Sequence, residues 1–169
     1  AFILTAMSLT ANAATFTVTG TSNAGAGSLR QAIIDANNSP GADTIVFSVN
    51  PFQTIQFNQI QISSELAITE DLTIDASNTK GVEITSFGTT RIFNISNATV
   101  QFNSLSIFSG SVTAPENGGC ILVNGGTTTI NNSIVWACNS TGNGGGIYVQ
   151  SGNLNFQNST LSFNSATLS

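Results

Sequence analysis

The sequence predicts one all-β domain, a right-handed parallel β-helix (solenoid) with an N-terminal amphipathic capping helix. Three observations support this class: an unusual composition, a single helix-like segment, and an internal repeat. Of 169 residues, 22 are Thr, 21 are Ser and 20 are Asn, whereas only three are basic and eight acidic. Ser, Thr and Asn are mediocre helix formers, which disfavours a helical bundle. Because 40% of the chain is apolar, disorder is disfavoured as well.

The same composition excludes several classes of function. The chain contains no histidine, so Ser-His-Asp catalysis, Cys-His catalysis and a histidine-based zinc site are excluded. With two arginines, one lysine and a net charge of −5, the sequence offers no basic patch for nucleic acid.

Residues 1–14 form a signal-like apolar segment. Residues 1–9 (AFILTAMSL) carry no charge, and Ala11-Asn12-Ala13 supplies the small-x-small pattern of an export cleavage site. We expect cleavage near Ala13 or Ala14, although a retained apolar strand or helix is the alternative. The apolar run is too short for a transmembrane span. The segment therefore predicts a secreted protein, extracellular or on the outer cell surface.

Residues 15–43 are predicted to form an N-terminal cap. Residues 14–19 (ATFTVT) alternate in the manner of a strand, and Ser28 with Gln31 is a capping-box start for a helix over 28–38. Stacked repeats need a cap over the exposed core and strand edges of their first unit. A partner-binding helix is the alternative. The apolar stripe that would cover the first coil consists of Leu29, Ala32, Ile33 and Ala36.

Residues 44–169 are predicted to form about five coils of the parallel β-helix. Short strands alternate with Gly, Asn and Ser turns, and each coil must stack on the next to bury its apolar face. The C-terminal end is predicted to be uncapped, so either the chain is a fragment or this edge pairs with another molecule. The repeat aligns 118–121 with 144–147 and Val135 with Leu161, and further upstream it aligns Val100 and Phe102 with Thr128 and Ile130, and Leu72 and Ile74 with Val100 and Phe102.

Two sets of motifs carry a family resemblance. Residues 16–19 (FTVT), 27–33 (GSLRQAI) and 40–47 (PGADTIVF) closely resemble the start of bacterial secreted proteins with the CSLREA-type N-terminal domain. Residues 144–147 (GGGI) and 158–166 (NSTLSFNSA) resemble the GGAI and FxxN repeats of polymorphic outer-membrane proteins. The Cys of the family name is absent here, where Gly27 precedes Ser28. The resemblance implies a right-handed parallel β-helix in a surface or secreted protein, often an adhesin, and it transfers no catalytic residue.

Candidate catalytic chemistry is sparse. Acidic residues cluster at Glu65, Glu70, Asp71, Asp75 and Glu83, and Glu116 is the only charged residue beyond Arg91. A glycosidase needs two facing carboxylates, whereas these acids sit mainly at predicted strand ends, where they contact solvent. We expect no cofactor and no catalysis; a Ca²⁺ site at Glu70, Asp71 and Asp75 is the weak alternative.

Two cysteines and two aromatic residues are the remaining candidates. Cys120 and Cys138 fall within one predicted coil and indicate either a disulfide or two buried thiols. Trp136 and Tyr148 lie next to inward-facing positions, so strand alternation points them outward. There they would stack on a sugar, anchor a partner, or be covered by a neighbouring coil.

The leading functional hypothesis is a non-catalytic surface or extracellular β-helix protein, structural or adhesive. Its expected partner is a second copy, bound head to tail in a filament through the uncapped C-terminal edge, or another surface protein. The alternatives are a polysaccharide-active enzyme fragment (a lyase or glycosidase) and a carbohydrate-binding module.

Overall fold

A computed structural model describes residues 12–48, 58–79, 81–88 and 90–167. It is a parallel β-solenoid of about five turns, and the strands make up about 49% of the chain. The predicted fold class is thereby confirmed. Most of the predicted signal-like segment, residues 1–11, lies outside the described residues.

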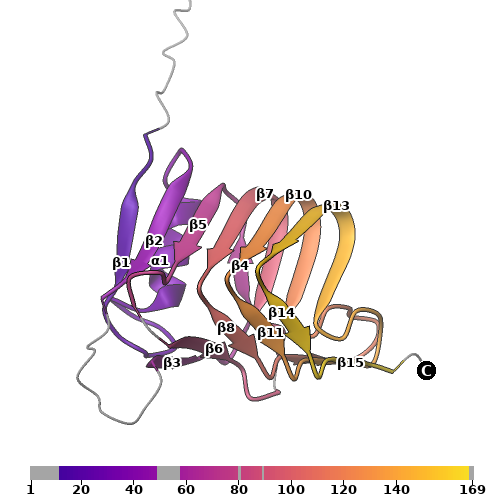
Figure 1. The fold of residues 1–169 in the computed structure, drawn as a ribbon. Coiled ribbons are helices and arrows are strands. Elements are labelled where there is room, and N and C mark those ends of the chain that lie inside the picture. Colours follow the sequence, from indigo (N-terminus) through magenta and orange to yellow (C-terminus); the bar gives the residue numbers. More distant parts are fainter. Residues whose placement is uncertain (1–11, 49–57, 80, 89, 168–169) are drawn as a thin grey trace, which may run out of the picture.

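Three parallel sheets form the walls of the solenoid. In Figure 1 the strands of the longest sheet follow each other across the molecule, from β1 to β13, with the C-terminus at the β13 end. That sheet has the order β1 (Thr15–Val18), β2 (Asp43–Phe47), β5 (Leu72–Asp75), β7 (Phe93–Asn103), β10 (Ile121–Asn131) and β13 (Ile147–Gln157), and β4 (Leu66–Ile68) also pairs with β7. The second has the order β14 (Thr160–Ser162), β11 (Ile134–Trp136), β8 (Ser106–Phe108), β6 (Val82–Thr85) and β3 (Asn58–Gln61), and the third β15 (Ser165–Ala166), β12 (Asn139–Ser140) and β9 (Ser111–Val112).

The register of the strands confirms the predicted repeat. Val135 is paired with Leu161, and Val100 is paired with Thr128, as the alignment of the repeats predicts. Leu72, which lies one coil earlier, is paired with Val100. Residues one repeat apart therefore stand above each other, which lets the sequence repeat build columns of like side chains.

Alternation along each strand places apolar side chains inside. In β7, Phe93 and Ile95 are buried before a corner, and Val100 and Phe102 are buried after it. The corner is at Asn97, whose φ of 55° reverses the alternation. This bend explains why the first half of β7 pairs with β4 and the second half with β5.

A glycine is required at the same corner in the next coil. Gly126 has a φ of 73°, and a Cβ there would collide with the carbonyl of Ala98 in the coil below. Glycine is thus needed both for its backbone conformation and for the close approach of two coils.

Helix α1 (Leu29–Asn37) closes the N-terminal end, as the apolar stripe predicts. Its four stripe residues are all buried and belong to the same core as the strands. Ser28 is the N-cap and accepts a hydrogen bond from the Gln31 backbone N–H. The second half of the expected capping box does not form, because the Gln31 side chain donates to Asp35 instead.

Three side chains of the cap form hydrogen bonds with the backbone beside β4 that a neighbouring strand would otherwise form. Asn23 accepts from the Ser63 N–H, and Arg30 donates to the carbonyls of Ser64 and Glu65. Asn37 donates to the Ala67 carbonyl and accepts from the Thr69 N–H. Partial burial lowers the pKa of the Arg30 guanidinium, which remains charged at neutral pH. The cap thus satisfies the open edge of β4 by hydrogen bonds as well as covering the core.

Replacing Asn37 with alanine is expected to lower the free energy of unfolding by about 0.5–1.5 kcal/mol, because two backbone groups beside β4 exchange a fixed partner for water. Urea denaturation followed by the fluorescence of Trp136, the only tryptophan, measures the effect. The matched control is Asn153→Ala, since Asn153 is exposed on β13. Equal stability of the two variants would contradict this role of Asn37.

Candidate functional site

The acidic residues of the first coils are dispersed. Asp71 accepts a hydrogen bond from the Thr99 N–H at 2.6 Å, and Asp75 accepts one from the Ser77 N–H at 2.8 Å. Both carboxylates therefore serve the backbone. Among the described residues no three acidic or cysteine side chains come together as a metal site, so Glu70, Asp71 and Asp75 are not gathered into one.

The buried guanidinium of Arg91 is the centre of a charged cluster that sequence reasoning missed. Its guanidinium is 2.7 Å from the Glu65 carboxylate and 3.3 Å from that of Glu116. It also donates to the carbonyls of Asn117 and Gly118. Positions 65, 91 and 117 are 26 apart, so the cluster is a column through three coils. That spacing, equal to the repeat, is the signal that would have revealed it.

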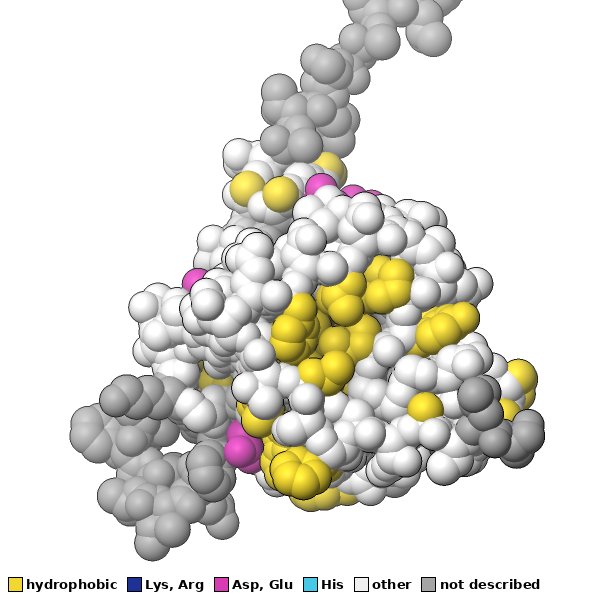
Figure 2. All heavy atoms as spheres, turned by 45° about the vertical axis from the view of Figure 1, so that its right-hand side comes forward, with side chains coloured by type: hydrophobic (Ala, Val, Ile, Leu, Met, Phe, Trp, Pro, Cys, Tyr) yellow, Lys and Arg dark blue, Asp and Glu magenta, His cyan; other side chains and the backbone are white. Residues whose placement is uncertain are grey.

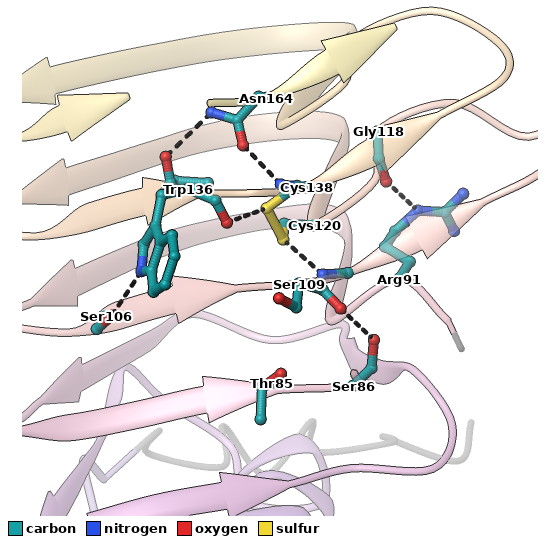
Figure 3. Close-up of a disulfide and its surroundings, with 12 residues drawn as sticks. Thr85, Ser86, Arg91, Ser106, Ser109, Gly118, Cys120, Trp136, Cys138 and Asn164 are labelled. Atoms are coloured by element: carbon teal, nitrogen blue, oxygen red, sulfur yellow. Dashed lines mark hydrogen bonds between the residues drawn. A yellow bond between two sulfur atoms is a disulfide. The ribbon is translucent and has the colours of Figure 1, made fainter. Parts of the chain in front are cut away.

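Cys120 and Cys138 are joined by a disulfide, with Cα atoms 5.6 Å apart (Figure 3). Both residues are fully buried, so the bond crosses the interior of one coil. Above it, Asn164 accepts from the Cys138 N–H and donates to the Val135 carbonyl. The disulfide is therefore built into the stack of coils and is closed to solvent.

The two candidate aromatic residues are partly covered. The Trp136 ring stacks on Phe108, with centroids 4.8 Å apart and planes 11° apart. Its indole N–H donates to the Ser106 hydroxyl (Figure 3). Tyr148 is half-buried, and its Cβ would be 3.2 Å from a Cβ added at Gly118 and 2.8 Å from one added at Gly144. One face of the Trp136 ring is thus covered by a residue of the neighbouring coil.

The last coil presents its core side to the outside. Val123, Ile130 and Val135 are fully buried, but the residues one repeat later are 37%, 38% and 53% exposed. Figure 2 shows hydrophobic side chains gathered at the centre of this end, within a surround of polar atoms. We call this surface the open end; its exposed apolar members are Val149, Phe156, Leu161 and Phe163.

The helix covers one end of the solenoid and not the other, but the edge strands at the two ends run in the same direction. β1 and β13 are the two edge strands of the same parallel sheet and therefore run in the same direction. Neither strand contains a charged residue. On the outer side of the cap, Ile34 is 44% exposed, so an apolar side chain is present at this end as well.

Comparison with known proteins adds no family to this fold. No protein-family model matches the chain, and no curated protein matches it. Within the described ranges, no helix has the length and apolar character needed to cross a membrane. The class defined by the structure is the parallel β-solenoid with a helical cap.

Proposed function

We propose that this chain is a non-catalytic structural or adhesive β-helix of the bacterial cell exterior. In this proposal its copies assemble head to tail into a filament. The observation that carries the proposal is the open end, an uncharged apolar surface opposite a helix-capped end. The resemblance of residues 27–33 to the CSLREA-type secreted proteins supports the exported, bacterial assignment.

The proposed contact places β13 of one copy beside β1 of the next. Both strands run in the same direction, so their pairing adds to a parallel sheet by β-augmentation. A contact between two different surfaces of one chain is heterologous, and it builds an open filament when it does not close into a ring. The exposed Ile34 side chain on the cap would then cover part of the open end.

The charged residues support a structural role. Glu65 and Glu116 are paired with Arg91, whereas Asp71 and Asp75 accept backbone hydrogen bonds. Along β10 and β13 the outward positions are mainly hydroxyl and amide side chains, which stack in columns without repulsion.

Leu161→Asp is expected to abolish self-association, because an unpaired carboxylate would enter an apolar contact. The wild-type chain should form filaments visible by negative-stain electron microscopy, with mass in light scattering rising with concentration. We expect the apparent dissociation constant of Leu161→Asp to rise at least about 10-fold. Phe87→Asp is the matched control, since Phe87 and Leu161 are both 53% exposed but only Leu161 lies on the open end.

Two results would contradict the proposal. One is a wild-type chain that remains monomeric at millimolar concentration; the cover of the open end would then be further coils of a longer chain. The other is equal loss of association in Phe87→Asp and Leu161→Asp, which would place the contact elsewhere. Ile34→Asp tests the opposite end and should weaken association to a similar degree.

A further inference from the structure

Asp43 is a buried carboxylate whose hydrogen bonding is incomplete. It lies at the start of β2 and is 1% exposed. Its Oδ1 accepts the backbone N–H of Ala14 at 2.7 Å, and the Ser39 hydroxyl is 3.5 Å away. Oδ2 has no hydrogen-bond partner among the described residues. An ionised carboxylate is costly to bury without a counter-charge, so a cation beside Oδ2 would stabilise this arrangement.

No described basic side chain provides that cation. Arg30 donates to Asn23 and to carbonyls beside β4, and Arg91 is paired with Glu65 and Glu116. β1 contributes no charged residue to the surroundings of Asp43. The other charged groups on the neighbouring elements are acidic: Asp35 on α1, and Asp71 and Asp75 at the two ends of β5.

Ala14, the donor to Asp43, directly follows the small-x-small pattern Ala11-Asn12-Ala13. We infer that the Ala13–Ala14 bond is the processing site of the exported chain, and that the new α-ammonium group of Ala14 forms a buried ion pair with Asp43. Hydrolysis by a peptidase that reads small side chains consumes one water and breaks the C–N bond. It leaves a carboxylate on Ala13 and an amine on Ala14, which takes up a proton at neutral pH.

The geometry suits this step on both sides of the bond. Asn12 and Ala13 are exposed, whereas the Ala14 carbonyl already accepts the Thr44 N–H at 2.9 Å. Ala14 is therefore the first residue fixed by the sheet. A peptide nitrogen offers Asp43 one proton, but an ammonium offers three, enough for both Oδ1 and Oδ2. Cleavage removes one described hydrogen bond, from the Asn12 N–H to the Pro40 carbonyl.

The ion pair is tested on chains that differ only at the N-terminus. Chain 14–169 contains every described strand and the helix, and it is compared with chain 13–169 and with the full chain. In urea denaturation at pH 6.5 we expect the unfolding equilibrium constant of chain 14–169 to be at least about 10-fold smaller than that of chain 13–169, as for a charge-assisted hydrogen bond. Asp43→Asn should erase this difference. Equal constants for chains 14–169 and 13–169 would overturn the ion pair.

A pH series gives a second readout that does not need the Asp43 variant to fold. Pairing with Asp43 raises the pKa of the Ala14 ammonium above its unfolded value of about 8. The added stability is then fully present below about pH 8 and is lost as the pH rises through the raised folded value. All side chains from residue 14 onward are common to both chains, so the difference reports whether the α-ammonium is placed on Ala14 or on Ala13. A difference that stays constant up to pH 10.5 would contradict the pairing.

The processing site is tested separately, because it rests on the proposed export. The full chain, preceded by Met-Lys-Lys to supply the basic start of an export signal, is produced in a bacterial host. Mass spectrometry of the secreted protein should show Ala14 as the first residue. A secreted protein with any other first residue overturns this inference, whereas retention in the cytoplasm counts against the proposed export itself.

Discussion

Arg91→Ala is expected to lower the free energy of unfolding by about 2–3 kcal/mol, because two backbone carbonyls lose a charged hydrogen-bond donor while the two carboxylates left behind can be solvated. Arg91 is 4% exposed, and its removal leaves two carboxylates and the carbonyls of Asn117 and Gly118 without their donor. Three coils lose their common contact at once. Urea denaturation at pH 7, followed by circular dichroism and by Trp136 fluorescence, measures the change.

The matched control for this effect is Glu116→Gln. The Glu116 side chain is 61% exposed, so its pair with Arg91 is screened by solvent and its loss should cost at most about 1 kcal/mol. Arg91→Lys keeps the charge but not the planar set of donors, and it should fall between the two. A cost below about 1 kcal/mol for Arg91→Ala would show that the column does not stabilise the fold.

Loss of the disulfide is the second large effect. For a sequence separation of 18 between the two cysteines, the entropy lost by the unfolded chain corresponds to about 3 kcal/mol of stability. The double variant Cys120→Ala and Cys138→Ala should therefore unfold at a markedly lower urea concentration than the oxidised wild-type chain. Because both cysteines are buried, reductant should act only after local opening of the coil.

Reductant supplies the control for the disulfide. It should destabilise the wild-type chain but leave the double variant unchanged, since the latter has no bond to break. Identical urea midpoints for the oxidised wild-type chain and the double variant would contradict the predicted contribution. The exchange of cysteine for alanine removes little volume, so a cavity contributes only a small part of the difference.

The fold could be predicted because each coil buries its apolar side chains at the same positions. Val100, Thr128 and Leu154 occupy one column, and the spacing of such columns is visible as a period in the sequence. The cap was also predictable, since its stripe of Leu29, Ala32, Ile33 and Ala36 is local to a helix.

Features that join different coils were less accessible. The sequence places Glu65 in a solvated acidic cluster, whereas in the structure it meets Arg91 one repeat later. The number of residues per coil varies among the first coils, as from Asp43 in β2 to Leu72 in β5, and this variation hides the 26-residue spacing of Glu65 and Arg91. The disulfide stays undecided at the sequence level because cysteines at this spacing also fit two separate columns. The open end is predicted as an uncapped edge, but the extent of its exposed apolar surface required the structure.

The hydrogen-bonded cap beside β4 also makes the two ends of the solenoid differ in how readily their coils open. In a stacked array each coil is stabilised only by its neighbours. At the capped end, Asn23, Arg30 and Asn37 supply hydrogen bonds in place of a neighbouring coil. In an isolated chain, the coil of β13, β14 and β15 contacts a neighbouring coil on one side only. Local opening should therefore begin at the last coil and advance toward β7. Amide hydrogen exchange in the isolated chain would accordingly be graded along the axis, fastest in β13–β15 and slowest in the coils of β5 and β7.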